Sequence, residues 1–358
     1  MDPMDHLEEL KQFARLHAGG QGMSPGHTAE VLARIGNDTP GDARSWAAVW
    51  TAAGRAAATR GDLLDACRHY ALARFPHPAD EDRALAQRLC VDAFDQWRLR
   101  QGGIERLEFG HPEGTVVCWA SGLDRGRPLL VVMGGIVSVK EQWAPLLPLF
   151  RKLGFAAVVA ELPGVGENTF TYGPESWRTL SFLMDRLEGR ARVTDTSMLA
   201  LSFSGHLALR AAAEDPRIRS VLTVGAPVAD FFTDEAWWPR VPGITVETLR
   251  RLTGSADEGE LRSVLAEFAL TPERLNGVRI PVRYVASSRD EIIPARDQAL
   301  LHRSLADVRF KTFDDVHGSP AHLGAMRRWL FSSLLRLRFT RRNRFLPKPR
   351  TSLSERPS

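Results

Sequence analysis

The feature that most constrains the fold is a series of short, nearly continuous apolar runs in the later part of the chain. They occupy residues 129–133, 156–160, 197–201, 221–224, 282–286 and 308–313. Strands that are buried on both faces have this pattern, because a parallel sheet carries helices on each side. Helical segments at 141–153 and 205–214 lie between the runs. The sequence therefore predicts an α/β fold with a mostly parallel sheet of about eight strands.

Two further strands and a helical region are expected before these runs. Residues 104–109 and 115–120 flank a turn at 111–114, which predicts an antiparallel pair. Residues 1–100 are predicted to form an N-terminal helical cap, in which Ser45 caps the first of three clear helices. These helices occupy residues 45–53, 61–74 and 80–98.

The alternation of strands and helices is interrupted once. Residues 228–275 contain helical stretches and no strand pattern, so we expect a helical lid inserted over the carboxyl edge of the sheet. The core then comprises residues 101–227 and 276–335. The last segment, 336–358, is rich in arginine and is expected to be a basic flexible tail.

Composition excludes several classes of function. The formal net charge is +4 with much of the excess in the tail, so the body of the chain does not indicate nucleic-acid binding. Cys67, Cys90 and Cys118 have no metal-binding spacing, which predicts buried free thiols and no metal centre. No apolar run reaches the length of a membrane span, and the first residues are unlike a signal peptide. We expect a cytoplasmic protein whose partner is a small-molecule substrate, and a homodimer is left open.

The segment that carries chemistry runs from a strand through a sharp turn into a helix at residues 197–213. This is the context of a nucleophile elbow, in which the residues two before and two after the nucleophile must be small. Ser202 meets the requirement, since its flanks are Ala200 and Ser204. Ser204 does not, because its second flank is His206, which is too large. We therefore predict Ser202 as the nucleophile.

A serine hydroxyl needs a base, and two later loops supply the partners. Asp290 follows the run at 282–286 and His317 follows the run at 308–313, in the order serine, acid, histidine that this kind of site requires. Asp290 would orient the imidazole of His317. Glu291 is the alternative acid and His322 the alternative histidine.

An oxyanion hole is expected after the run at 129–133. Gly134 and Gly135 allow backbone N–H groups to point into the site, so the predicted donors are the N–H groups of Phe203 and of Gly135 or Ile136. The glycines of the turn at 161–167 lack dinucleotide spacing and are interpreted as structural. No cofactor is expected.

At these residues the chain resembles the α/β-hydrolase superfamily, and within it the FrsA-like group of esterases and carbon–carbon hydrolases. Residues 134–141, Gly-Gly-Ile-Val-Ser-Val-Lys-Glu, are similar to that group's Gly-Gly-x-Asp-Ser-x-Lys-Glu. Residues 202–213 resemble its Ser-x-Gly-Gly-Tyr-x-Ala-x-Arg-Ala-Ala, and the likeness spans about residues 45–335. Val137 and Ser204 depart from the group's aspartate and glycine. The resemblance implies an α/β-hydrolase fold with the triad intact.

The resemblance also implies a function, with alternatives. The first is hydrolysis of an ester or acyl group of a small, polyketide-derived metabolite through Ser202, His317 and Asp290. The second is elimination of acetate from an acetylated tetronate-type ring, with His317 removing a proton beside a carbonyl. The third is a binding protein that keeps the fold without the chemistry. Phe231, Trp237 and Trp238 of the lid either line the substrate pocket or only pack the lid onto the core.

Overall fold

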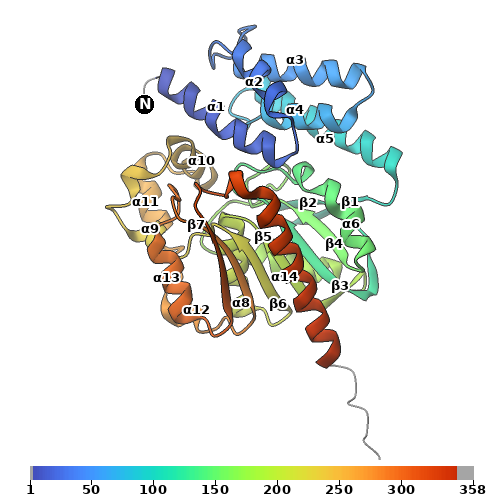
Figure 1. Ribbon diagram of the computed structural model, residues 1–358, viewed down its shortest axis with the longest axis vertical. Coiled ribbons are helices and arrows are strands. Elements are labelled where there is room, and N and C mark those ends of the chain that lie inside the picture. Colours follow the sequence, from blue (N-terminus) through green and yellow to red (C-terminus); the bar gives the residue numbers. More distant parts are fainter. Residues whose placement is uncertain (1–2, 345–358) are drawn as a thin grey trace, which may run out of the picture.

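The computed structural model describes residues 3–344 and is built around one eight-stranded sheet (Figure 1). Its spatial order is β1-β2-β4-β3-β5-β6-β7-β8. β2 pairs antiparallel with both β1 and β4, and the other neighbours are parallel. The strands are β1 (Glu105–His111), β2 (Gly114–Ser121), β3 (Asp124–Met133), β4 (Ala156–Ala160), β5 (Ala191–Ala200), β6 (Ile218–Val224), β7 (Val282–Ser287) and β8 (Val308–Phe313). The predicted α/β fold with a mostly parallel sheet is confirmed.

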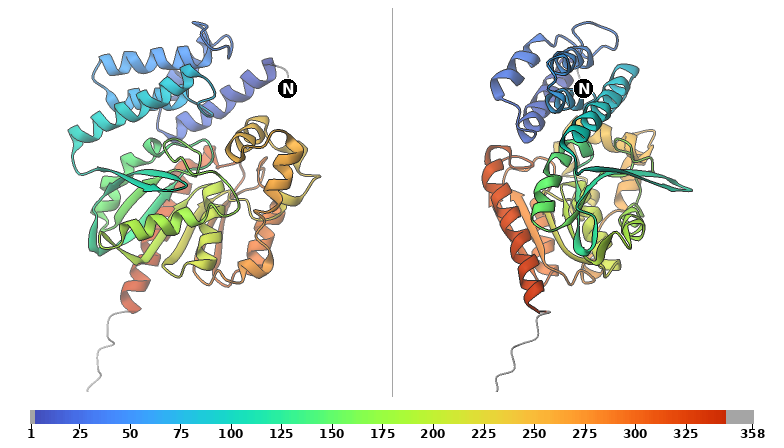
Figure 2. Two further views of the ribbon diagram at one scale, coloured as in Figure 1. Left: turned by 180° about the vertical axis from the view of Figure 1, so that it is seen from behind. Right: turned by 90° about the vertical axis from the view of Figure 1, so that its right-hand side faces the viewer.

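The continuous apolar runs are explained by helices on both faces of the sheet. Every residue of β4 and of β7 is buried. In Figures 1 and 2, α6 (Leu147–Lys152) and α14 (Leu323–Arg344) cover one face, while α7 (Arg178–Leu187) and α8 (Phe203–Glu214) cover the other. The central strands β4 and β7 therefore have no solvent-facing side that would select polar residues.

The helix predicted over 141–153 is broken into shorter pieces. Two 3₁₀ turns, η1 (Lys140–Gln142) and η2 (Ala144–Leu146), precede the short helix α6. Pro145 and Pro148 are the second residues of η2 and α6, within the first turn, where a residue without an N–H group is tolerated. Because each proline removes a donor that a continuous helix would need, the segment cannot form one.

Five helices precede the sheet and lie over the carboxyl ends of its strands (Figure 1). They are α1 (Pro3–Gly20), α2 (Pro25–Arg34), α3 (Trp46–Thr59), α4 (Leu63–Ala73) and α5 (Glu81–Gln101). The Ser45 side chain accepts a hydrogen bond from the N–H of Ala48 and caps α3, as predicted. These helices share a small apolar core that includes Trp46, Trp50 and Phe75, and Ile244 from the later insertion joins it.

The segment between β6 and β7 contains only helices. These are α9 (Asp230–Thr233), η3 (Trp238–Arg240), α10 (Gly243–Thr253), α11 (Glu258–Ala266) and α12 (Pro272–Leu275). α10 contacts α1, so the insertion and the N-terminal helices meet above the sheet. The division of the chain into cap, core and lid remains our proposal.

The end of the chain departs from the expected tail. α13 (Ala295–Ser304) follows β7, and η4 (Pro320–His322) leads into α14, which extends to Arg344. Residues 336–344 of the predicted flexible tail are therefore helical, because Leu330, Leu334 and Leu337 continue one buried stripe of α14. The rest of the predicted tail, 345–358, lies outside the described residues.

Cys67, Cys90 and Cys118 are free and buried, as predicted. Burial raises the pKa of Cys118 to about 12, so this thiol is not a reactive thiolate. Across residues 3–344, no helix combines the length and the apolar character needed to cross a membrane.

Candidate active site

Ser202 stands at a strained turn between β5 and α8. Its backbone has φ 55° and ψ −128°, a region that residues with a side chain rarely occupy. Close packing around the turn explains the small neighbours, since a side chain at Gly205 would overlap Thr223 and Ala226. The turn lifts the Ser202 hydroxyl above the carboxyl end of the sheet, as the elbow pattern predicts.

Ser202, His317 and Asp290 form one hydrogen-bonded chain. Ser202 Oγ lies 3.1 Å from His317 Nε2, although the two residues are 115 positions apart. His317 Nδ1 lies 3.0 Å from both carboxylate oxygens of Asp290. Because the ionised carboxylate only accepts, Nδ1 carries the proton and Nε2 faces the serine as an acceptor.

Asp290 is itself held in place. Its Oδ1 accepts hydrogen bonds from the N–H groups of Ile292 and Ile293, at 3.0 Å and 2.8 Å. Burial alone would lower the pKa of His317, but the Asp290 carboxylate opposes it and Glu291 adds to that effect, so the pKa is raised above its usual value.

The alternative residues have other contacts. Ser204 is buried and donates a short hydrogen bond to the carbonyl oxygen of Gly134. Glu291 accepts from the backbone N–H of His317 at 2.9 Å and does not contact its ring. His322 Nδ1 pairs with Asp315 at 3.0 Å. None of the three contacts the hydroxyl of Ser202 among the interactions of residues 3–344.

The residues predicted to form the oxyanion hole lie beside the serine. Gly135, Ile136 and Phe203 line the same cavity as Ser202 and His317. A Cβ atom at Gly135 would come within 3.1 Å of Ser202 Cβ, so the loop approaches the nucleophile as closely as a glycine allows.

A buried charge cluster supports this loop, and sequence reasoning missed it. Lys140 Nζ lies 2.9 Å from Glu141 Oε1, 3.4 Å from Glu161 Oε2 and 2.6 Å from Glu167 Oε2. Glu161 also accepts from the backbone N–H groups of Lys140 and Glu167, at 3.0 Å and 2.9 Å. The cluster therefore joins the loop after β3 to the turn at 161–167.

Burial dominates the electrostatics of the cluster. It disfavours the charge of Lys140, but the carboxylates of Glu141, Glu161 and Glu167 outweigh it and raise the pKa of the ammonium group. Burial raises the pKa of Glu161 to about 7 despite the attraction of Lys140. The sequence signal for this cluster was the presence of charged residues in two loops that follow neighbouring strands. Lys140 and Glu141 follow β3, and Glu161 and Glu167 follow β4.

A cavity of about 190 Å³ opens above Ser202 and His317. Its walls are mostly apolar, and α1 contributes Phe13, Leu16 and His17 to them. Burial, with Arg74 and His317 nearby, lowers the pKa of His17 to about 4, so its ring is neutral at pH 7. Sequence reasoning did not place α1 here, because the docking of a surface helix depends on tertiary packing.

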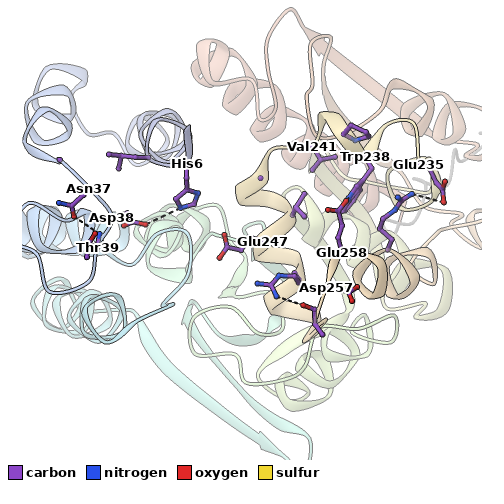
Figure 3. Close-up of a pocket in the computed structure, with 18 residues that line it drawn as sticks. His6, Asn37, Asp38, Thr39, Glu235, Trp238, Val241, Glu247, Asp257 and Glu258 are labelled. Carbon is purple, nitrogen blue, oxygen red and sulfur yellow. Dashed lines mark hydrogen bonds and ion pairs between the residues drawn. The ribbon is translucent and has the colours of Figure 1, made fainter. Parts of the chain in front are cut away.

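The three lid aromatics are not among the residues that line this cavity, so the pocket-lining alternative is wrong for it. Phe231 packs edge-on against Phe203, with ring centroids 5.2 Å apart. Trp237 Nε1 donates to the carbonyl of Ile292 at 2.7 Å. Trp238 lines a separate cavity of about 1110 Å³ between the N-terminal helices and the insertion, where Figure 3 shows it near Glu258. Aromatic side chains suit both roles, because they can pack the lid onto the core or line a pocket. The sequence alone therefore does not distinguish the two.

No group of three or more His, Cys, Asp or Glu side chains within residues 3–344 could hold a metal ion. The arrangement of Ser202, His317 and Asp290 suits nucleophilic attack and proton transfer, and the backbone N–H groups beside the serine suit stabilisation of a developing oxyanion.

Comparisons with known proteins show the family of the chain. A family model described as "Esterase FrsA-like" matches residues 43–319. Esterase FrsA of Escherichia coli is 25% identical over 258 residues, a match that spans 68% of this chain but only 62% of that protein.

Solved structures give a closer match. The structure of wild-type AbyA5 is 50% identical, with a TM-score of 0.89 over 93% of this chain and 94% of that one. A 2,6-dihydroxy-pseudo-oxynicotine hydrolase is 18% identical with a TM-score of 0.70 over 88% of this chain and 94% of that one, which is a likeness of fold alone.

Proposed function

The chain belongs to the FrsA-like esterase family, and on that premise we propose that it hydrolyses an ester or acyl group of a small metabolite with Ser202 as nucleophile. The observation that carries the proposal is the hydrogen-bonded chain from Ser202 Oγ through His317 to Asp290. A binding protein would have no need for a serine in a strained backbone conformation beside an imidazole acceptor.

In the first half of the reaction, Ser202 Oγ attacks the acyl carbon while its proton moves to His317 Nε2. The Asp290 carboxylate stabilises the resulting imidazolium. The backbone N–H groups of Phe203 and of Gly135 or Ile136 stabilise the negative charge that forms on the carbonyl oxygen. The C–O bond to the leaving alcohol then breaks, and His317 returns its proton to that oxygen.

In the second half, water replaces the alcohol. His317 takes a proton from the water as the water oxygen attacks the acyl-enzyme. The C–O bond to Ser202 then breaks as His317 returns that proton to Ser202 Oγ, and a carboxylic acid is released. The mostly apolar cavity favours a substrate with apolar groups beside the reacting carbonyl. A polyketide-derived metabolite has this character.

The decisive experiment replaces Ser202 by alanine. Turnover of an activated ester should fall by several orders of magnitude while circular dichroism stays unchanged. A fluorophosphonate should label the wild-type serine and not the variant. His317→Ala should likewise lower turnover. His322→Ala is its matched control and should not, since His322 pairs with Asp315 and does not contact the serine. Wild-type turnover by Ser202→Ala would reject the proposal and favour a non-catalytic or different role.

Isotope labelling separates hydrolysis from acetate elimination, which remains a prediction from the resemblance. Hydrolysis of an acetylated ring in water labelled with heavy oxygen leaves an alcohol and acetate that carries one labelled oxygen. Elimination breaks the C–O bond on the ring side, so it leaves an alkene, and neither product gains label. Mass spectrometry of both products decides between them.

A further inference from the structure

A second cavity adjoins the catalytic one and has no role in the steps described above. It has a volume of about 510 Å³ and lies between α6, α14 and the start of the loop after α1. The two cavities share wall residues, among them Gln142, Trp143, Leu201, Leu323 and Met326. We call the second cavity the distal pocket.

The distal pocket is strongly apolar. Leu146 and Leu149 from the α6 side face Leu330 and Leu334 from α14 across it, and Phe150 stacks on Phe331 with centroids 6.0 Å apart. Leu146 and Leu149 are 39% and 41% exposed, which is unusual for leucines gathered in one concave wall. Apolar side chains left open in this way mark a binding surface for an apolar ligand.

Two residues of the wall that the cavities share, Gln142 and Trp143, carry polar atoms that are unpaired within residues 3–344. Gln142 Oε1 and Trp143 Nε1 are buried without a hydrogen-bond partner among the described residues. Because Gln142 and Trp143 line both cavities, a substrate that occupies both would pass these two side chains.

We propose that the distal pocket is a substrate subsite that takes a long aliphatic chain, which continues from the reacting group past Gln142 and Trp143. The kinetic test of this inference rests on the proposed function. The binding of the aliphatic chain to the pocket does not depend on that function. Each methylene that enters the pocket should favour binding by about fourfold, since its burial removes apolar surface from water. The chain can belong to the acyl group or to the alcohol of the ester.

The test places a charge in the pocket wall. Leu146 lines the pocket and is 39% exposed, so Leu146→Asp puts a carboxylate in the pocket wall without burying it completely. Calorimetry with decanol and hexanol measures chain binding without catalysis. Decanol should bind more tightly than hexanol to the wild type, and Leu146→Asp should weaken decanol binding roughly tenfold, the effect of about two buried methylenes. Leu99→Asp, at a leucine 64% exposed on α5, is the control and should change neither.

Kinetics identify which part of the ester the pocket holds. One series varies the acyl group from acetate to decanoate, and the other varies the alcohol of an acetate from ethanol to decanol. For each series, the ratio of kcat/KM for the longest ester to that for the shortest is compared between wild type and Leu146→Asp. This ratio should fall about tenfold in the variant in one series, and that series identifies the part of the ester that the pocket holds. Equal alcohol binding by wild type and variant would overturn the distal pocket. If chains bind as expected but no ester is hydrolysed, the proposed function fails and the pocket stands.

Discussion

Arg74 Nη1 donates a hydrogen bond to the carbonyl oxygen of Val137 at 2.7 Å, and this contact ties the N-terminal helices to the loop beside Ser202. Arg74 is 1% exposed. Burial lowers its pKa to about 10, which Glu161 and Glu141 partly offset, so the guanidinium stays charged at neutral pH. Val137 stands where the resembling group has aspartate, and here the arginine uses the backbone of that residue.

Replacing Arg74 by methionine should loosen the loop that carries Gly135 and Ile136. We expect kcat to fall roughly tenfold, because one charge-assisted hydrogen bond positions the oxyanion donors. KM should change less, since the apolar walls of the cavity remain. Steady-state kinetics on one ester measures both. Arg88→Met, at an exposed position of α5, is the control, and an unchanged kcat in Arg74→Met would show that the loop holds its own shape.

Lys140→Met should strongly destabilise the fold. It leaves the carboxylates of Glu141 and Glu161 buried without their cation, which costs about 3–5 kcal/mol. Urea unfolding gives the free energy. Adding Glu161→Gln should recover part of the loss, because one uncompensated charge is removed. Lys152→Met, at an exposed site, is the comparison, and equal midpoints for the two lysine variants would contradict a role for the cluster.

The pH profile of kcat/KM should report His317. The base must be neutral, so activity rises as pH passes upward through its pKa, which lies above the ordinary value near 6.5. Asp290→Asn removes the main interaction that raises this pKa. The acidic limb should move to lower pH while turnover falls by about four orders of magnitude, because the imidazole loses its orientation. Asp314→Asn, at an exposed carboxylate, should leave the limb in place, and an unmoved limb in Asp290→Asn would contradict the assignment.

Stability should fall as pH decreases from about 7 to about 4. Burial lowers the pKa of His206 to about 4, whereas the unfolded chain has an ordinary histidine that binds its proton near 6.5. The unfolded state therefore holds more protons in this window, and the native state loses up to about 1.4 kcal/mol per pH unit for this group.

His206→Gln keeps a donor for the carbonyl of Phe268, which His206 Nε2 contacts at 2.8 Å, and does not titrate. Its unfolding free energy should depend less on pH, as measured by urea midpoints across the window. His302→Gln, at an exposed histidine, should follow the wild type. An identical pH slope for His206→Gln and wild type would assign the acid sensitivity to other groups.

The central strands of the sheet could be predicted because they are apolar on both faces and most are separated by helical segments. In the structure every residue of β4 and β7 is buried, which agrees with their short apolar runs. The bringing together of Ser202, Asp290 and His317 followed from the rule that loops after parallel strands meet at one edge. That they perform catalysis stays a proposal until the variants are measured.

What could not be predicted depends on packing between distant elements. Nothing local in the sequence indicates that His17 lines the cavity beside His317. Nothing local indicates either that Phe231 packs on Phe203 instead of lining that cavity. An apolar side chain or a neutral ring can either line a cavity or pack in the core. The burial of Lys140 was equally hidden, because lysine is expected at the surface unless its carboxylate partners are known.

The family match begins at residue 43, whereas the wall that Phe13, Leu16 and His17 present to the substrate comes from α1. Part of the wall of the cavity above Ser202 and His317 therefore lies outside the stretch that the family model matches. We expect relatives that differ in their first helix to differ in the substrates they accept. A chimera that exchanges residues 3–42 between two such proteins should carry the selectivity of its donor.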